Sequence, residues 1–129
     1  MKLKITVICL LTIFAFGLAG ITSADGIRKR LKFAKGRSAT TVSGAVIRGD
    51  EDTYIVGARG GQTMRVKITS LEKNAVFQVR DADGNYLQDA GEGDDATNWT
   101  GDLPSTGDYE IIVGGTRGNA TYKLTVSIK

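Results

Sequence analysis

The chain has 129 residues, of which 17 are basic and 14 acidic, with no histidine and one cysteine. Without histidine the chain lacks the commonest general base and a principal zinc ligand, and one cysteine cannot close a disulfide within the chain. This composition argues against most hydrolytic, metal-dependent and thiol chemistry, and it favours a protein that works by binding.

The first 24 residues follow the order of a secretory signal peptide. Lys2 and Lys4 give a basic start, residues 5–18 form an apolar run, and residues 22–24 are small or hydroxylated. The apolar run is shorter than the roughly 20 residues that span a bilayer. A cleaved signal peptide is therefore favoured over the alternative, a permanent anchor helix.

Cleavage is expected after Ala24, with Ala19 as a less favoured site. It would remove Cys9 and leave residues 25–129 as a single periplasmic or secreted domain, with no membrane segment. The remaining chain would have 15 basic and 14 acidic residues, a net charge of +1. No basic domain remains for a nucleic-acid partner, although the whole-chain pI is 9.1.

Hydrophobic alternation with a period of two recurs along this domain, and turn residues separate the runs. The runs that predict strands are residues 30–33, 41–46, 54–58, 63–68, 77–79, 109–113 and 121–128. Only residues 27–33 are ambiguous between helix and strand. Residues 88–99 predict a long solvated loop, or a short edge strand around Trp99. The pattern predicts an all-β fold, an antiparallel β-sandwich of about seven to nine short strands, with a small barrel as the alternative.

Charge is unevenly distributed along the predicted strands and loops. Residues 28–37 hold six basic residues and no acid, whereas residues 81–110 hold nine acids and no basic residue. Such runs usually form solvated faces, and the alternative is a polarised molecule that steers toward a charged partner. No sequence feature selects two of the nine acids as a glycosidase pair, so no enzyme activity, catalytic residue or cofactor is predicted.

One acidic segment imitates a calcium-binding loop. Asp81, Asp83, Asn85 and Glu92 stand at ligand positions one, three, five and twelve. Position six is Tyr86 where a glycine is needed for the sharp turn, and no helical pattern flanks the segment. The favoured interpretation is a hairpin turn, with a weak calcium site as the alternative.

Arg117 is distinguished by its position in the chain. It is the one basic residue between Arg80 and Lys123, and it lies in the glycine-rich segment 114–119 between two regular strands. A guanidinium can pair bidentately with a carboxylate, so Arg117 is a candidate binding hot spot. An ordinary solvated arginine is the competing interpretation.

Several short motifs occur in the order found in a known family. They are Lys35-Gly36-Arg37-Ser38-Ala39, Ser43-Gly44, Asp52-Thr53-Tyr54, Gly61-Gln62, Leu103 to Tyr109, Thr116-Arg117 and the closing run from Tyr122 to Lys129. Together they resemble the periplasmic inhibitors of goose-type (g-type) lysozyme over nearly the whole of residues 25–129. Residues 61–63 and 105–111 are also typical of the β-sandwich domains appended to bacterial peptidases.

The resemblance implies an exported β-sandwich that blocks the lysozyme groove with protruding loops. It implies lysozyme-binding roles for Arg117, Thr116, Asp50, Gly118 and Asn119. The chain departs from the family pattern at Asp50, where the family has a tyrosine, and its loop after Arg117 is shorter and less basic. Two alternatives remain: a free-standing module that binds an extracellular polymer or calcium, and a structural protein of the envelope.

Overall fold

The computed structural model describes residues 26–129, and these residues form eight β-strands and no helix. In chain order the strands are β1 (Arg28–Arg30), β2 (Ala39–Val46), β3 (Glu51–Ala58), β4 (Thr63–Thr69), β5 (Ala75–Arg80), β6 (Asn98–Asp102), β7 (Gly107–Gly115) and β8 (Ala120–Ile128). The predicted signal peptide, residues 1–24, lies outside the described residues. Within residues 26–129, no helix has the length and hydropathy to cross a bilayer.

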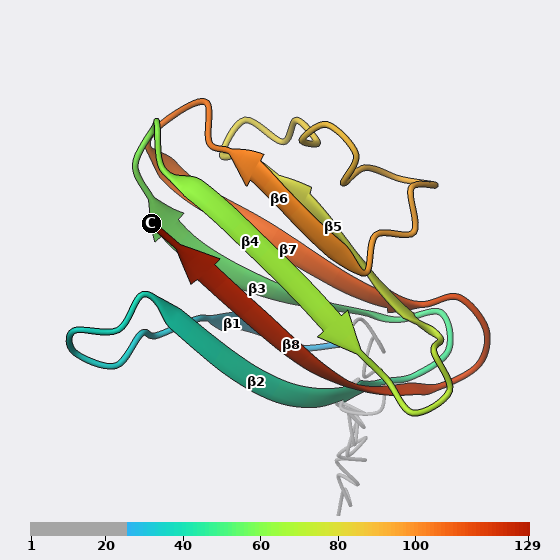
Figure 1. Ribbon diagram of the computed structural model, residues 1–129. Helices are drawn as coiled ribbons and strands as arrows, with labels where there is room; N and C mark the ends of the chain where they lie inside the picture. The colour runs from blue at the N-terminus through green and yellow to red at the C-terminus, as the bar shows by residue number, and fades with distance from the viewer. Residues whose placement is uncertain (1–25) are drawn as a thin grey trace, which may run out of the picture.

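Two four-stranded sheets pack face to face as a sandwich (Figure 1). One sheet has the strand order β1-β3-β7-β5, and the other has the order β2-β8-β4-β6. Neighbouring strands are antiparallel except β1 and β3, which run parallel. The prediction of an all-β sandwich is confirmed, and the small barrel is not the fold.

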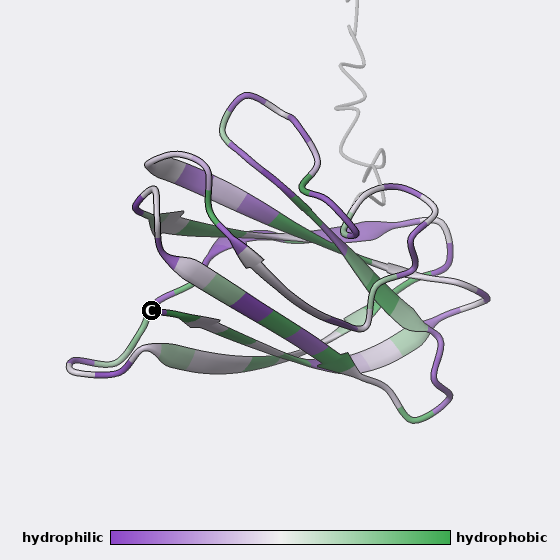
Figure 2. Ribbon diagram, turned by 45° about the horizontal axis from the view of Figure 1, so that its top comes forward, coloured by the Kyte–Doolittle hydropathy of each residue, from purple (hydrophilic) through white to green (hydrophobic). Residues whose placement is uncertain are grey.

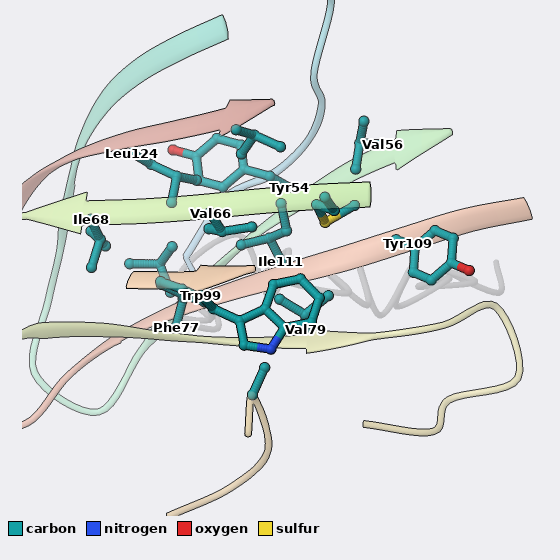
Figure 3. Packing of buried hydrophobic residues seen from close by; sticks show 14 of the residues in the cluster. Tyr54, Val56, Val66, Ile68, Phe77, Val79, Trp99, Tyr109, Ile111 and Leu124 are labelled. Carbon is teal, nitrogen blue, oxygen red and sulfur yellow. The ribbon is translucent and has the colours of Figure 1, made fainter. Parts of the chain in front are cut away.

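The core lies between the sheets and follows from the period-two alternation. In β4, Met64, Val66 and Ile68 are buried while the residues between them are exposed. Large side chains from both sheets meet in this core, among them Tyr54, Phe77, Trp99 and Tyr109 (Figure 3). Figure 2 shows hydrophobic colour concentrated on the strands and hydrophilic colour on most connections. A shift of one residue would turn the apolar side chains outward, so the alternation fixes the register.

Several strand boundaries differ from the predicted ones. The first strand is β1 and not residues 30–33, because the chain leaves the sheet after the N–H of Leu31 donates to the carbonyl of Ile55 at 2.8 Å. β5 extends beyond residues 77–79, since each of its residues has a register partner in β7. Of the two alternatives predicted for residues 88–99, the edge strand around Trp99 is confirmed: it is β6, which pairs with β4.

The connections between strands gather at two ends of the sandwich. The β2–β3, β4–β5 and β7–β8 connections lie together at one end, on the right in Figure 1. The β1–β2, β3–β4 and β6–β7 connections lie at the other end, near the C-terminus. The first end therefore carries the segment that contains Arg117.

Candidate functional site

Three connections at one end of the sandwich form a single hydrogen-bonded unit, which we call the loop cluster: residues 47–50, 70–74 and 116–119. Asn74 joins two of them. Its side-chain amide donates to the carbonyl of Arg117 at 3.0 Å and to the carbonyl of Asn119 at 2.9 Å. In return, the N–H of Thr116 donates to the carbonyl of Asn74 at 2.8 Å. The β7–β8 loop is thus held along its length by one residue.

Asn74 is itself held by the β4–β5 turn. The hydroxyl oxygen of Ser70 accepts from the N–H of Asn74 at 3.0 Å and from that of Ala75 at 3.2 Å. Lys73 adopts φ 53°, the left-handed conformation that lets the turn reverse before Asn74. The Asn74 side chain is only 1% exposed, and a buried amide must be hydrogen-bonded to remain stable there.

The β2–β3 turn is attached to the same unit. The N–H of Arg48 donates to the side-chain oxygen of Asn119 at 2.8 Å. The N–H of Asp50 donates to the carbonyl of Ile47 at 2.9 Å, and Gly49 supplies φ 84° in the turn. All three segments of the loop cluster are therefore connected by hydrogen bonds.

Arg117 lies exposed on this cluster, and its guanidinium is partly fixed. Its Nη2 atom donates to the carbonyl of Glu72 at 2.8 Å. Within residues 26–129 it forms no salt bridge, whereas Arg28, Arg30 and Arg80 all do. Arg117 is therefore oriented by the neighbouring turn while its charge has no carboxylate partner among the described residues.

A buried polar network lies next to the β2–β3 turn. Asp52, 3% exposed, accepts the hydroxyl of Tyr122 at 2.6 Å and the N–H of Ile27 at 3.0 Å. The hydroxyls of Tyr122 and Tyr54 are 2.5 Å apart. Because Tyr122 donates its one proton to Asp52, Tyr54 must donate to Tyr122. Gly44 makes room for this network, since a Cβ there would lie 2.5 Å from the Tyr122 hydroxyl.

Burial raises the pKa of both tyrosines. Desolvation is the main cause that raises the pKa of Tyr122, and its hydrogen bond to Asp52 adds to the effect. Desolvation also raises the pKa of Tyr54. Both hydroxyls therefore stay protonated in the fold at pH values where a free tyrosine ionises.

The predicted basic and acidic runs meet on the sheet that contains β1. Glu110 contacts Arg28 at 2.5 Å and Arg80 at 2.6 Å, and Arg30 pairs with Asp108 through two hydrogen bonds. Partial burial acts to raise the pKa of Glu110, but hydrogen bonds from both arginines more than reverse this and hold the pKa below its ordinary value. Part of the basic run is thus neutralised within the molecule.

The calcium-like segment is folded as a turn. The side-chain oxygen of Asp81 accepts the N–H groups of Asp83 at 3.0 Å and Asn85 at 2.9 Å, and Gly84 has φ 85°. Glu92 accepts the hydroxyl of Tyr86 at 3.3 Å. In the described part of the chain, no three acidic, histidine or cysteine side chains are grouped to hold a metal.

Comparison with solved structures identifies the family. The structure of PliG from Aeromonas hydrophila, a periplasmic lysozyme inhibitor of g-type lysozyme, is 30% identical to this chain with a TM-score of 0.67. The match covers 80% of this chain and 96% of that one. This chain belongs to the PliG family. The resemblance drawn from the sequence motifs is confirmed.

Other solved structures agree with this assignment. A mutant of the Escherichia coli PliG is 25% identical over 81% of this chain and 99% of that one, with a TM-score of 0.65. The Salmonella Typhimurium PliG is 26% identical with the same coverage and a TM-score of 0.63. A pre-peptidase C-terminal domain of a Bacillus anthracis collagenase, 21% identical with a TM-score of 0.53 over 81% of this chain and 96% of that one, shares the fold. No family model and no curated protein matches the chain.

In this PliG-family chain the residues assigned from the motifs lie together in the loop cluster. Thr116, Arg117, Gly118 and Asn119 form the β7–β8 loop, and Asp50 lies half-buried in the attached β2–β3 turn. Gly118 has φ 63°, a conformation that favours glycine in a tight loop. The side chain of Asn119 accepts a backbone N–H within the cluster, so it contributes to the frame of the loop.

Asn74, which holds the β7–β8 loop, was not predicted from the sequence. Replacing it tests how much its amide contributes to stability. We expect Asn74→Ala to lower the free energy of unfolding by about 1–3 kcal/mol, because two loop carbonyls lose their donor. Asn74→Asp should be at least as damaging, since a carboxylate would face those same carbonyls. Denaturant unfolding measures both, with the exposed Asn98→Ala as the control. An unfolding free energy equal to the parent's for both Asn74 variants would contradict the role assigned to the amide.

The effect of calcium on thermal stability is a second test in this PliG-family chain. Since the Asp81 carboxylate is used within the turn, we expect melting temperatures in millimolar calcium and in chelator to agree within about 2 °C. Magnesium at equal ionic strength is the control for screening. A larger rise with calcium alone would demonstrate a calcium site in the fold and would revive the polymer- or calcium-binding alternative.

Proposed function

We propose that the protein is a periplasmic inhibitor of goose-type lysozyme and that it blocks the groove in which the enzyme cleaves peptidoglycan. Membership of the PliG family supports the partner and the compartment. The expected signal peptide is consistent with export. The inhibitor performs no chemistry of its own, and it competes with the glycan substrate for the groove.

The observation that supports this mode of inhibition is the guanidinium of Arg117. It is exposed, oriented by the Glu72 carbonyl, and without a salt bridge within residues 26–129. Glycoside hydrolases commonly carry catalytic carboxylates in their grooves. A guanidinium forms two parallel hydrogen bonds with a carboxylate, and such charge-assisted pairs are strong when water is excluded. We therefore assign Arg117 the role of inserting into the acidic groove.

The frame around Arg117 contributes by reducing the cost of binding. A flexible loop would lose conformational entropy on insertion, and this loss subtracts from affinity. Asn74 and the carbonyl of Glu72 hold the loop and the guanidinium in place before the enzyme arrives. In this proposal Thr116 and Gly118 contact the groove beside Arg117. Asp50 and Asn119 lie at its margin.

Titration of the exported chain, residues 25–129, against goose-, chicken- and invertebrate-type lysozymes tests the proposal. We expect inhibition of the goose-type enzyme at micromolar concentration or below, and competition with the glycan substrate. If none of the three enzymes is inhibited, lysozyme inhibition is wrong for this chain. The polymer-binding module would then be the function to test, by binding to peptidoglycan and other envelope polymers.

A further inference from the structure

A strongly exposed apolar side chain lies in the same loop cluster as Arg117. Leu71, in the β4–β5 turn, is 93% exposed, more than any other large apolar side chain among residues 26–129. Ile47, in the β2–β3 turn, is 62% exposed. Both line one surface hollow of about 350 Å³, together with Glu72, Asn74 and Asn119 among others. Figure 2 shows hydrophobic colour at the β4–β5 turn, where most connections are hydrophilic.

The β4–β5 turn does not need the Leu71 side chain in order to fold. The turn is closed by Ser70 and Asn74, and Lys73 supplies its left-handed residue. The Leu71 side chain belongs to neither the buried core nor the partly buried shell around it. A single exposed leucine is common on protein surfaces, whereas two exposed apolar side chains that line one hollow form a small apolar surface suited to contact with a partner.

Leu71 and Arg117 are displayed by one rigid connection. The carbonyl of Glu72, the residue after Leu71, accepts the hydrogen bond from the Arg117 guanidinium at 2.8 Å. The same turn places Asn74 under the β7–β8 loop. The leucine is therefore one residue from the carbonyl that orients the arginine, and the same turn holds both.

We propose that Leu71 is a second anchor of the inhibitory surface, and that it packs on apolar surface at the rim of the lysozyme groove while Arg117 enters the groove. This inference rests on the proposed function. Arginine is enriched among binding hot spots, and an apolar side chain beside it can exclude water from the charged contact that the arginine makes. The hollow between Leu71 and Ile47 accepts an apolar side chain from the rim in return.

Leu71→Ser tests the inference, measured with the parent and Arg117→Ala against goose-type lysozyme. We expect inhibition to weaken about tenfold, because the apolar contact is lost while the exposed side chain contributes little to folding. The melting temperature should stay within about 2 °C of the parent. The loss should persist at high salt, whereas the effect of Arg117→Ala should shrink as salt screens its charge. Tyr86→Ser, in the β5–β6 connection, is the control for losing an exposed apolar side chain elsewhere.

Other results would show whether the second anchor alone is wrong or whether lysozyme inhibition is wrong as well. If Leu71→Ser inhibits as well as the parent while Arg117→Ala does not, the second anchor is wrong and the inhibitory loop stands. If the parent inhibits no lysozyme, both fail. If the parent is a dimer that Leu71→Ser dissociates without changing inhibition, measured by light scattering, the patch is a contact between copies and the inference is overturned.

Discussion

Replacing Arg117 with alanine is expected to weaken inhibition of goose-type lysozyme about thirtyfold or more, which corresponds to about 2 kcal/mol of binding free energy. The guanidinium would lose its carboxylate partner in a site from which water is excluded. Folding should be nearly unchanged, because the side chain is exposed and its one hydrogen bond, to the Glu72 carbonyl, lies at the surface. Inhibition constants and melting temperatures of the two proteins measure these effects separately.

Four further substitutions sharpen this test. Arg117→Lys keeps the charge but loses the planar fork, so it should recover only part of the affinity. Arg48→Ala and Lys73→Ala should cost much less than Arg117→Ala, as charges at an interface rim do. Arg59→Ala, in the β3–β4 connection at the opposite end, should leave inhibition unchanged. If Arg117→Ala inhibits as well as the parent, the β7–β8 loop is not the inhibitory site.

The strands could be predicted because each has one face against the core. Val66 and Ile68 in β4 alternate with Arg65 and Lys67, and the structure buries the first pair and exposes the second. Where strands end depends on partners that are distant in the chain. β5 gains residues at both ends because β7 is long enough to pair with them, and no local pattern contains that information.

The position of Arg117 could be predicted, but its supporting frame could not. A basic residue between two regular strands is visible in the sequence as a loop position. The partners of Asn74 are separated from it by 43 and 45 residues, and Asn74 itself belongs to a polar turn that resembles any other. Leu71 lies in the same polar turn, and only the fold brings this turn into contact with Arg117.

The charge runs were visible in the sequence, but their consequence depended on the topology. Arg30 and Asp108 are separated by 78 residues, and the packing of β1 and β7 on either side of β3 brings them together. The basic and acidic runs therefore cancel in part on one sheet. Arg117, like the other arginines outside β1 and β5, has no salt-bridge partner within residues 26–129, and it is distinguished by the hydrogen bond that orients its guanidinium on the Glu72 carbonyl.

A large loss of stability is expected in alkaline solution, and it originates in the buried tyrosine pair. The fold raises the pKa values of Tyr54 and Tyr122, mainly through burial. Unfolded tyrosines ionise near pH 10, so above that pH the unfolded chain binds fewer protons than the folded chain. The stabilisation is complete below pH 10, and it is lost as the pH rises toward the folded-state pKa values. The slope reaches at most about 1.4 kcal/mol per pH unit for each tyrosine.

Tyr54→Phe separates this cause from general alkaline damage. The variant keeps the hydrogen bond from Tyr122 to Asp52 and loses one of the two protons that only the folded chain retains. We expect its free energy of unfolding, measured by denaturant between pH 9 and about pH 11.5, to fall less steeply with pH than that of the parent. Lysine ionisation contributes equally to both proteins and cancels in the comparison. An unchanged slope would mean that the buried pair does not set the alkaline limit, because each tyrosine that stays protonated in the fold must add its own share of the pH dependence.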